Sequence, residues 1–342
     1  MNKIVHILCD SNITNNFVDF SSKNFDNHNH IYLNYFNKYT YLNHENIVKS
    51  NIKSINGFIK IIVLLYKSEK ILLHGLHEKY FILLLFFNPF LLKKCYWFLW
   101  GADLYKSLPT EEKKINSFNY FIKSKVIKNL GYIVTYIKGD YDLAKKHFKT
   151  KAQYMECIMY TSNVYHEFKP KEKYKSNTII LAGNSASKTN NHIDLFNKLK
   201  KIKDDNIKLF VSLAYGDMDY AKEVIKKGKI IFKDKMIPIQ TFMPLTDYLN
   251  FLGSVDIAIF NHRRQEGMGN IITLLGLGKK VYLSKETTPW ILFRQLGIKV
   301  FANHEFDIKP LDKVIQLNNI KIIKKYFSEQ NLLCQLHGLY SE

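Results

Sequence analysis

Short apolar runs alternate with longer segments of helical spacing along the whole chain. The first half holds four such runs and the second half five, at residues 3–9, 70–73, 95–100, 131–137, 178–182, 207–213, 229–232, 255–260 and 280–283. A short apolar run with polar flanks predicts a buried strand. Strands that alternate with helices predict parallel sheets with helical crossovers. We therefore expect an α/β protein built from doubly wound, Rossmann-like sheets.

A polar, lysine-rich segment at residues 168–177 separates the two series of strands. It contains Pro170 and has the composition of an interdomain linker. A length of 342 residues suits two domains of ordinary size. We expect an N-terminal domain over residues 1–168 and a C-terminal domain over residues 169–342, facing a cleft. Ligands of such domains bind beyond the carboxyl ends of the strands.

Composition narrows the choice of partners. Apolar residues make up 46% of the chain and charged residues 23%, which are ordinary values for a globular protein. The net charge of +20 favours nucleotides, nucleic acids or an acidic membrane face as partners. The lysines are spread along the whole chain without a nucleic-acid-binding motif, so a nucleic-acid-binding protein is the weaker alternative.

The cysteines and the N-terminus indicate a reducing compartment. Cys9, Cys95, Cys157 and Cys334 have no paired spacing, so we expect free thiols and neither a zinc site nor a disulfide framework. The first apolar run resembles a buried strand more than a secretory signal, which predicts a cytoplasmic protein.

The loop after the first strand of the second half, Gly183 to His192 (GNSASKTNNH), is rich in small and hydroxyl residues. Between a strand and a helix, such residues present backbone N–H groups and a helix N-terminus to an anion, and a diphosphate would suit this loop. It is neither a dinucleotide fingerprint nor a P-loop. Ordinary helix capping and turn formation are the alternative.

A second loop, Asn261 to Asn270 (NHRRQEGMGN), follows the strand at 255–260. Arg263 and Arg264 supply planar groups suited to phosphate, and Gly267 and Gly269 allow close approach of a ligand to the backbone. Solvated arginines and simple turn glycines are the alternative.

Candidate acid–base groups follow two strands of the first half. His74, His77 and Glu78 come after residues 70–73, and Asp103 comes after an aromatic strand. Histidine titrates near neutral pH, and a carboxylate at a strand end can take a proton from an acceptor hydroxyl. Satisfied histidines, and Asp103 as a helix N-cap, are the alternatives.

Two segments suggest contact with a membrane surface. Residues 80–92 (YFILLLFFNPFLL) are too short to span a bilayer, which takes about 20 apolar residues, and form either an interfacial segment or a buried helix. Residues 111–130 place Ile115, Phe118, Ile122 and Val126 on one helical face with lysines around it. This pattern fits an anionic membrane surface or an amphipathic helix packed on the sheet.

Four motif blocks together carry a resemblance to a known family. They are HG at 74–75, WGADLY at 100–105, AGNSASKTNNHI at 182–193 and FNHRRQEGMGNIITLLGLGKKVYL at 260–283, with Trp290 following. In this order they resemble the enterobacterial 4-acetamido-4,6-dideoxygalactosyltransferase family, which elongates the lipid-linked precursor of enterobacterial common antigen.

The resemblance implies an inverting, metal-independent glycosyltransferase of the GT-B type, with no cofactor. Its donor would be a dTDP-linked 4-amino-4,6-dideoxy sugar, and its acceptor a polyprenyl-diphosphate-linked saccharide of enterobacterial common antigen or O-antigen synthesis. The expected location is the cytoplasmic face of the inner membrane, as a peripheral protein on an anionic surface. A UDP or GDP sugar on the same fold remains the alternative donor.

The resemblance also implies residue roles. Asp103 and His74 become candidates for the catalytic base. The donor-binding candidates are Gly183, Asn184, Ser185, Asn190, His192, Arg263, Arg264, Gln265, Glu266, Gly267, Met268, Gly269 and Asn270. Where the family tends to read Gln-Gln-Gly-Ile-Gly, this chain has Gln265-Glu266-Gly267-Met268-Gly269, which leaves the exact donor sugar open.

Overall fold

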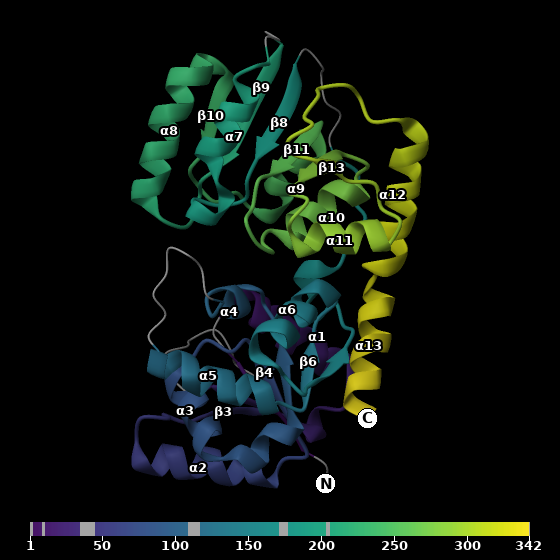
Figure 1. Ribbon diagram of the computed structural model, residues 1–342. Helices are drawn as coiled ribbons and strands as arrows, with labels where there is room; N and C mark the ends of the chain where they lie inside the picture. Colours follow the sequence, from purple (N-terminus) through teal and green to yellow (C-terminus); the bar gives the residue numbers. More distant parts are fainter. Residues whose placement is uncertain are drawn as a thin grey trace. The chain divides into compact units, whose positions relative to one another are not determined.

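A computed structural model describes residues 3–8, 11–34, 45–108, 117–170, 177–202 and 206–341. The chain forms two compact units: Met1–Ser162 together with Glu329–Glu342, and Asn163–Ser328 (Figure 1). Each unit is a doubly wound α/β structure around a parallel sheet, so the predicted fold class is confirmed. The division lies before the expected boundary at residues 168–169, and the C-terminal helix packs on the first unit.

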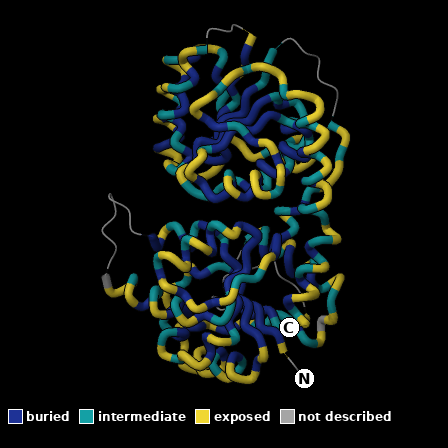
Figure 2. Tube along the Cα trace, turned by 45° about the vertical axis from the view of Figure 1, so that its right-hand side comes forward, coloured by how far each residue is buried: buried dark blue, intermediate teal, exposed yellow. Residues whose placement is uncertain are grey.

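The first unit holds a seven-stranded parallel sheet in the order β3-β2-β1-β4-β5-β6-β7. Its strands are β1 (Ile4–Ile7), β2 (His30–Asn34), β3 (Ile47–Lys49), β4 (Lys70–His74), β5 (Cys95–Phe98), β6 (Tyr132–Val134) and β7 (Gln153–Met155). The central strands β1, β4 and β5 are buried on both faces, as a parallel sheet requires (dark blue in Figure 2), whereas the edge strands β3 and β7 are partly exposed.

Helices cover both faces of this sheet. The helices are α1 (Asn12–Asn24), η1 (Asn27–Asn29), α2 (Ile55–Lys67), α3 (Lys79–Phe87), η2 (Pro89–Lys94), α4 (Ala102–Tyr105), α5 (Ser117–Asn129), α6 (Lys138–Phe148) and α13 (Glu329–Ser341). Val5 and Ile7 share one core with Leu65 of α2 and Leu85 of α3. On the opposite face, Phe17 of α1 and Tyr340 of α13 pack against His6 of β1.

The second unit holds a six-stranded parallel sheet in the order β10-β9-β8-β11-β12-β13. Its strands are β8 (Thr178–Ala182), β9 (Ile207–Ser212), β10 (Met236–Ile239), β11 (Ile257–Phe260), β12 (Lys280–Leu283) and β13 (Phe301–Ala302). Its helices are η4 (Lys188–Asn190), α7 (His192–Leu199), α8 (Met218–Phe232), η5 (Lys233–Lys235), α9 (Leu245–Ser254), α10 (Met268–Gly276), α11 (Thr288–Gln295) and α12 (Lys313–Tyr326), and η3 (Thr161–Asn163) joins the units.

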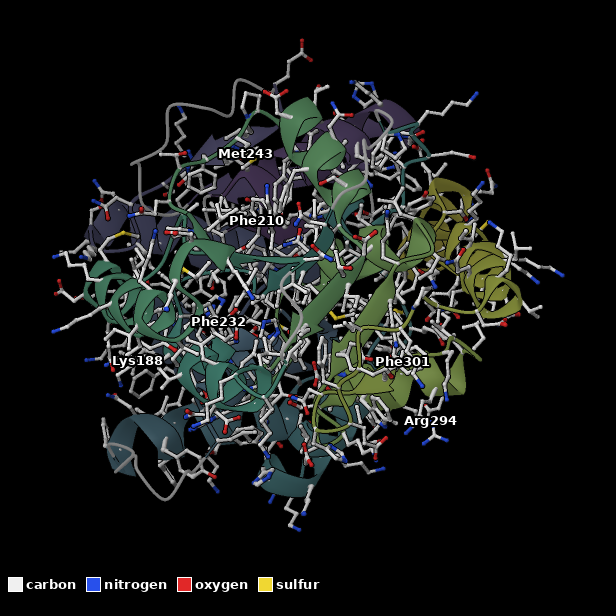
Figure 3. All side chains as sticks on the ribbon, turned by 90° about the horizontal axis from the view of Figure 1, so that it is seen from above. Lys188, Phe210, Phe232, Met243, Arg294 and Phe301 are labelled. Carbon is white, nitrogen blue, oxygen red and sulfur yellow. The ribbon has the colours of Figure 1, made fainter. Side chains whose placement is uncertain are left out.

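One expected strand is wrong. Residues 229–232 form the last turn of α8, and the strand is β10, which begins at Met236. The run at 229–232 is apolar because Phe232 packs into the core from the helix. Pro238 lowers the strand signal of β10, and it is tolerated because β10 is an edge strand. Phe210, in the neighbouring strand β9, and Phe232 are labelled in Figure 3.

The two segments that suggested membrane contact, residues 80–92 and 111–130, each have some apolar side chains in the core and others exposed to solvent. In α3 and η2, Leu85 and Leu91 are buried, whereas Phe87 and Phe90 are 74% and 83% exposed. In α5, Ile122 and Val126 are buried and Phe118 is exposed, while Ile115 lies outside the described residues. No helix in the described part of the chain is long and apolar enough to cross a membrane.

The strand order reverses once in each sheet, between β1 and β4 and between β8 and β11. At such a switch point the two flanking loops diverge, and the carboxyl ends of the strands leave a crevice that binds ligands. The loop after β8 begins at Gly183, and the loop after β11 begins at Asn261. The two loops singled out in the sequence therefore meet at the switch point of the second unit.

Candidate active site

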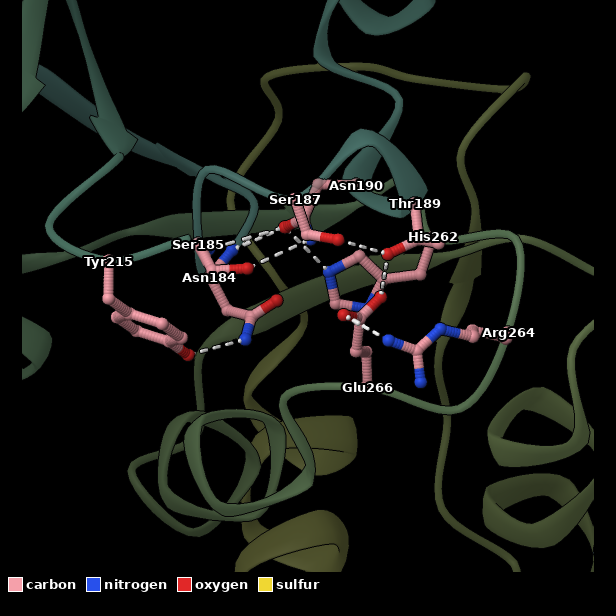
Figure 4. A network of polar contacts seen from close by, with 9 residues as sticks. All are labelled: Asn184, Ser185, Ser187, Thr189, Asn190, Tyr215, His262, Arg264 and Glu266. Atoms are coloured by element: carbon pink, nitrogen blue, oxygen red, sulfur yellow. Dashed lines mark hydrogen bonds and ion pairs between the residues drawn. The ribbon is translucent and has the colours of Figure 1, made fainter. Parts of the chain in front are cut away.

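The side-chain amide of Asn190 joins the two loops of the second unit (Figure 4). Its Oδ1 accepts hydrogen bonds from the backbone N–H of Asn184 (2.8 Å) and of Ser185 (3.4 Å), and it lies 3.1 Å from Nε2 of His262. Its Nδ2 donates to Oγ of Ser185 at 3.3 Å. Asn190 and His262 are both buried. One amide thus fixes the backbone after β8 against the loop after β11.

His262 is held neutral in this arrangement. An amide oxygen only accepts hydrogen bonds, so His262 carries its proton on Nε2. Burial, with a smaller contribution from the neighbouring His192, lowers the pKa of His262 to about 3. A neutral His262 adds a hydrogen-bond donor to the loop without adding charge.

Two glycines allow the loops to pack this closely. Gly183 has a φ of 67° and Gly267 a φ of 66°, in the left-handed region that favours glycine. A Cβ on Gly183 would lie 2.5 Å from Nε2 of His192 and 2.8 Å from Oδ1 of Asn190. A Cβ on Gly267 would lie 3.1 Å from Cγ of Asn184. Both positions therefore require glycine, for conformation as well as for space.

Unpaired polar atoms converge beside these glycines. Both ring nitrogens of His192 and Oδ1 of Asn184 are buried and have no hydrogen-bond partner among the described residues. Burial lowers the pKa of His192 to about 4, so its ring is neutral. Buried polar groups are normally paired, and an unpaired set at a switch point is typical of a ligand site.

The second loop carries an internal ion pair. Glu266 accepts hydrogen bonds from Oγ1 of Thr189 (2.5 Å) and from Arg264 (2.8 Å), and both charged side chains are mostly buried. Arg263 is exposed and donates to Oδ1 of Asn191 at 3.4 Å. The charge of Arg264 is therefore already balanced by Glu266. Sequence alone could not reveal this pairing, because it depends on the path of the loop.

The remaining donor candidates lie around the start of α10. Gln265 is half-buried, and Met268, the first residue of α10, is buried in the core. Gly269 and Asn270 lie in the first turn of the helix, and Asn270 borders a neighbouring pocket. The candidates of the second unit thus lie on one pair of loops, with Met268 turned away from their surface.

A pocket of about 280 Å³ adjoins this cluster. Its lining comprises Asn184, Ser212, Ala214, Tyr215, Ile239, Thr241, Phe242, Met243, Leu245, Tyr248 and Asn270. The rings of Tyr215 and Phe242 are stacked, with centroids 5.7 Å apart, and Asn184 donates to the Tyr215 hydroxyl at 2.9 Å. Sequence analysis missed this pocket, although both aromatic residues follow strand ends.

In the first unit, the carboxylate of Asp103 is fully engaged. It accepts hydrogen bonds from the Trp97 indole (2.6 Å) and from three backbone N–H groups, those of Leu76 (2.9 Å), Trp100 (3.1 Å) and Leu104 (3.1 Å). Asp103 is 1% exposed and lies inside α4, whose N-cap is Gly101. It ties the loop after β4 to the loop after β5.

His74 is also enclosed, whereas His77 is exposed. His74 is buried between His6 and Tyr160, and burial lowers its pKa to about 3. His77 lies at the surface, edge-on to the Trp100 ring with centroids 6.2 Å apart. Partial burial of the ring lowers the pKa of His77, and the charge of Asp103 opposes that shift.

The structure also shows how potential metal ligands and thiols are distributed. No group of three or more His, Cys, Asp or Glu side chains among the described residues could hold a metal ion. Cys95, Cys157 and Cys334 are free thiols, and the first two are buried. Cys9 lies outside the described residues.

Solved structures define the class of the fold. Anabaena Alr3699/HepE, solved with UDP-glucose, is similar over all of both chains, with a TM-score of 0.71 and 12% identity. Sucrose-phosphate synthase from Thermosynechococcus elongatus has a TM-score of 0.70 and 9% identity, over 100% of this chain and 98% of that one. A Rickettsia africae glycosyltransferase has a TM-score of 0.66 and 14% identity, over 99% and 98%. The fold is that of the GT-B glycosyltransferases.

The family follows from the sequence. The profile of glycosyltransferase group 56, the 4-alpha-L-fucosyltransferases, matches residues 59–321, and the chain belongs to this family. The match spans both candidate loops of the second unit and the histidine and aspartate motifs of the first. It confirms the broader class to which the family named in the sequence analysis belongs, that of fucosyltransferase-like glycosyltransferases.

The neutral histidines predict acid sensitivity. The folded-state pKa of His192 and of His262 lies below the unfolded value of about 6.5. Below pH 6.5, the unfolded chain therefore binds protons at these histidines that the folded chain does not bind. We expect the free energy of unfolding to be constant above pH 6.5. Below it, stability should fall by about 1.4 kcal/mol per pH unit for each such histidine.

Urea unfolding of the wild type, His192→Phe and His304→Gln between pH 7 and pH 5 measures this slope. The His192→Phe variant should show a smaller slope, whereas His304→Gln, at an exposed site, should match the wild type. Equal slopes in all three proteins would contradict a neutral His192.

Proposed function

We propose that this protein is an inverting, metal-independent glycosyltransferase of bacterial surface polysaccharide synthesis. It moves a 4-amino-4,6-dideoxy sugar, similar to 4-acetamido-4,6-dideoxygalactose, from dTDP to a polyprenyl-diphosphate-linked saccharide of enterobacterial common antigen or O-antigen. The observation that carries the transferase assignment is the set of unpaired polar atoms between Gly183 and Gly267 at a switch point. The motif resemblance supports this donor and this acceptor.

The leaving nucleoside diphosphate binds between the two loops of the second unit. Departure of the diphosphate requires donors or dipoles that stabilise its growing negative charge. The N-terminus of α10, which begins after Gly267, and the neutral ring of His192, whose nitrogens have no partner among the described residues, supply such groups. Arg264 contributes less charge than the sequence suggested, because Glu266 is bound to it. Arg263 is exposed, and its side chain donates a long hydrogen bond of 3.4 Å to Asn191, so it is the arginine that we assign to the diphosphate.

The nucleoside binds in the adjoining pocket. The stacked pair of Tyr215 and Phe242 offers an aromatic surface to a base, and Oγ of Ser212 is buried without a partner among the described residues. The volume of about 280 Å³ is near the lower end of the usual range for a small-ligand site. The solved relative from Anabaena holds UDP-glucose, so a UDP sugar is the alternative donor on this fold.

His77 is the catalytic base in this proposal. An inverting transfer needs one group that removes the proton of the acceptor hydroxyl. The oxygens of Asp103 accept four N–H groups, and His74 is enclosed, so neither side chain offers an open acceptor to a substrate. His77 is exposed, and the negative charge of Asp103 stabilises the imidazolium that forms when His77 takes the proton.

An apolar surface of the first unit binds the membrane that carries the acceptor. Ile55, Ile59 and Val63 are 80%, 54% and 45% exposed along one face of α2. Tyr66 of the same helix donates a hydrogen bond to Asn88 at 3.2 Å, which places Phe87 and Phe90 beside this face. The same helices and the turn before α2 carry exposed lysines at positions 53, 60, 67, 79 and 93. Apolar side chains on helices that also carry lysines suit an anionic bilayer, here the cytoplasmic face of the inner membrane.

Nucleotide preference tests the donor. We expect dTDP to raise the melting temperature more than UDP, GDP or a short oligonucleotide, because a ligand at 100 times its Kd stabilises the folded state by about 2.7 kcal/mol. Asn190→Ala, which removes the amide joining the loops, should lose the shift, and Asn197→Ala, on the exposed face of α7, should keep it. A preference for UDP or GDP would overturn the dTDP donor, and a response to the oligonucleotide alone would overturn the transferase.

The base is tested by His77→Gln. Loss of a general base lowers turnover by about 10²- to 10⁴-fold, and the nucleotide-induced melting shift should stay within error, because the nucleotide binds in the second unit. His28→Gln, at another exposed histidine of the first unit, should retain wild-type turnover. Normal turnover in His77→Gln would remove His77 from the mechanism.

Membrane binding is tested by cosedimentation with vesicles. We expect Phe87→Ser/Phe90→Ser to bind phosphatidylglycerol vesicles at least tenfold more weakly than the wild type, because each exposed phenylalanine buries apolar surface on insertion. Val314→Ser/Leu317→Ser, which replaces exposed apolar residues of the second unit, should bind normally. Equal binding of both variants, or equal binding of the wild type to neutral phosphatidylcholine vesicles, would contradict the assignment.

A further inference from the structure

Three buried histidines lie in a row across the sheet of the first unit. In the strand register, Ile4 pairs with His30, and His6 pairs with Leu72, two residues before His74. Paired residues of a parallel sheet share a face, so the three histidines lie on one face in a diagonal that advances from the amino to the carboxyl edge. All three are 4% exposed or less.

Hydrogen bonds join these rings into one chain. Nδ1 of His30 lies 2.8 Å from Nε2 of His6, and Nδ1 of His6 lies 3.1 Å from Nε2 of His74. Nδ1 of His74 lies 2.9 Å from the Tyr160 hydroxyl, which accepts a hydrogen bond from the Trp100 indole at 2.6 Å. The chain therefore runs unbroken from His30 to Trp100.

The two ends of the chain lie in different surroundings. His30 lines a pocket of about 270 Å³ at the amino edge of the sheet, together with Asp26, Glu69 and His337. Trp100, at the carboxyl edge, is half-buried and lies edge-on to His77. The hydrogen-bond chain thus connects this pocket, at the far edge of the sheet from the candidate base His77, with Trp100, which packs against His77.

The three rings of the hydrogen-bond chain are neutral, and all their hydrogen bonds run from donor to acceptor in the same direction. A neutral imidazole has one donor and one acceptor nitrogen, so an unbroken chain of neutral rings requires the same tautomer in all three. Burial holds the pKa of His6 well below its usual value and lowers that of His30 to about 4 and of His74 to about 3. The rings are therefore neutral at pH 7, and their hydrogen bonds are directional.

A merely structural core would not need this chain. Apolar side chains would fill the same space without the desolvation that three imidazoles require, and networks of this kind fix geometry when every member is paired. Phe17 packs against His6, His74 and Tyr160 and closes the face of the chain. The polar groups leave the position of the Tyr160 hydroxyl little freedom.

We propose that His30, His6 and His74 are positioning residues, which fix the Tyr160 hydroxyl and through it the Trp100 indole beside His77. The backbone of Trp100 is held independently by Asp103. The side chain and the backbone of Trp100 are then fixed from opposite directions, and Trp100 sets the place of the His77 ring. The effect on catalysis rests on the function proposed above, but the hydrogen-bond chain itself does not.

The first test determines the protonation state and the tautomer of the three imidazoles in the wild type by ¹⁵N NMR at pH 7. We expect the signals of His30, His6 and His74, assigned by single substitutions, to show three neutral rings in one tautomer. Mixed tautomers or a protonated ring among the three would overturn the proposal. The measurement is made on the wild type and needs no substrate; the substitutions serve only to assign the signals.

The second test follows the indole N–H signals of Trp97 and Trp100, which are distinguished from each other and from that of Trp290 with Trp100→Phe and Trp290→Phe. In His6→Leu, which breaks the chain in its middle, the Trp100 signal should shift. The Trp97 signal should stay in place, because its indole is bound to Asp103 at 2.6 Å. Phe17→Leu alters packing against the same rings without removing a hydrogen bond, and it should leave both signals near their wild-type positions. An unmoved Trp100 signal in His6→Leu would overturn the proposal.

The third test asks whether breaking the hydrogen-bond chain lowers the rate of catalysis. We expect His6→Leu to lower kcat by at least tenfold with nucleotide affinity unchanged, because misplacing a group that holds the base lowers turnover and not donor binding. Wild-type kcat in a variant whose indole signal has moved would overturn the positioning role and leave the proposed function intact. Absence of transfer by the wild type with any nucleotide sugar would contradict the proposed function, and the tautomer result would still stand.

Discussion

The hydrogen bonds of the Asn190 amide hold the candidate donor site together. Its oxygen gathers the N–H groups of Asn184 and Ser185 and the ring of His262, and so binds the loop after β8 to the loop after β11. The strand order β10-β9-β8-β11-β12-β13 places these loops side by side, and the amide fixes their separation. The left-handed glycines and the unpaired His192 follow from this close packing. Without the amide, the two backbone N–H groups and the His262 ring would lose their shared acceptor.

Neutral buried groups, more than charged ones, shape both candidate sites. The chain carries a net charge of +20, yet Arg264 is neutralised by Glu266, and the buried histidines of both units are held uncharged. Surface lysines supply long-range attraction to anionic partners, whereas dipoles and single hydrogen bonds determine geometry inside the sites. The excess of positive charge therefore indicates the kind of partner, and the loops determine what is bound. Asp103 also determines geometry, because its carboxylate accepts hydrogen bonds from four N–H donors and so fixes two loops.

Periodicity predicted the central strands of both sheets, but it missed β2, β3, β7 and β13, which lie at or next to a sheet edge. The strands at 178–182 and 280–283 have the bounds that their apolar runs indicated, because both lie between two other strands and are mostly buried. The strand at 236–239 was missed because Pro238 weakens its pattern, and a helical turn at 229–232 gave a false signal. The two candidate donor loops could be singled out from the sequence because parallel strands bring their carboxyl ends to one edge. The histidine chain was not found, because its contacts join residues 24, 68 and 86 positions apart, and only the strand register aligns them.

The central claim is that a nucleoside diphosphate occupies the switch point of the second unit. A crystal structure with bound dTDP tests it most directly. The account predicts the diphosphate between the loop at Gly183 and the start of α10, within hydrogen-bond reach of His192 or Asn184, and the base in the pocket beside Tyr215 and Phe242. A diphosphate bound elsewhere, with His192 and Asn184 still unpaired, would contradict it.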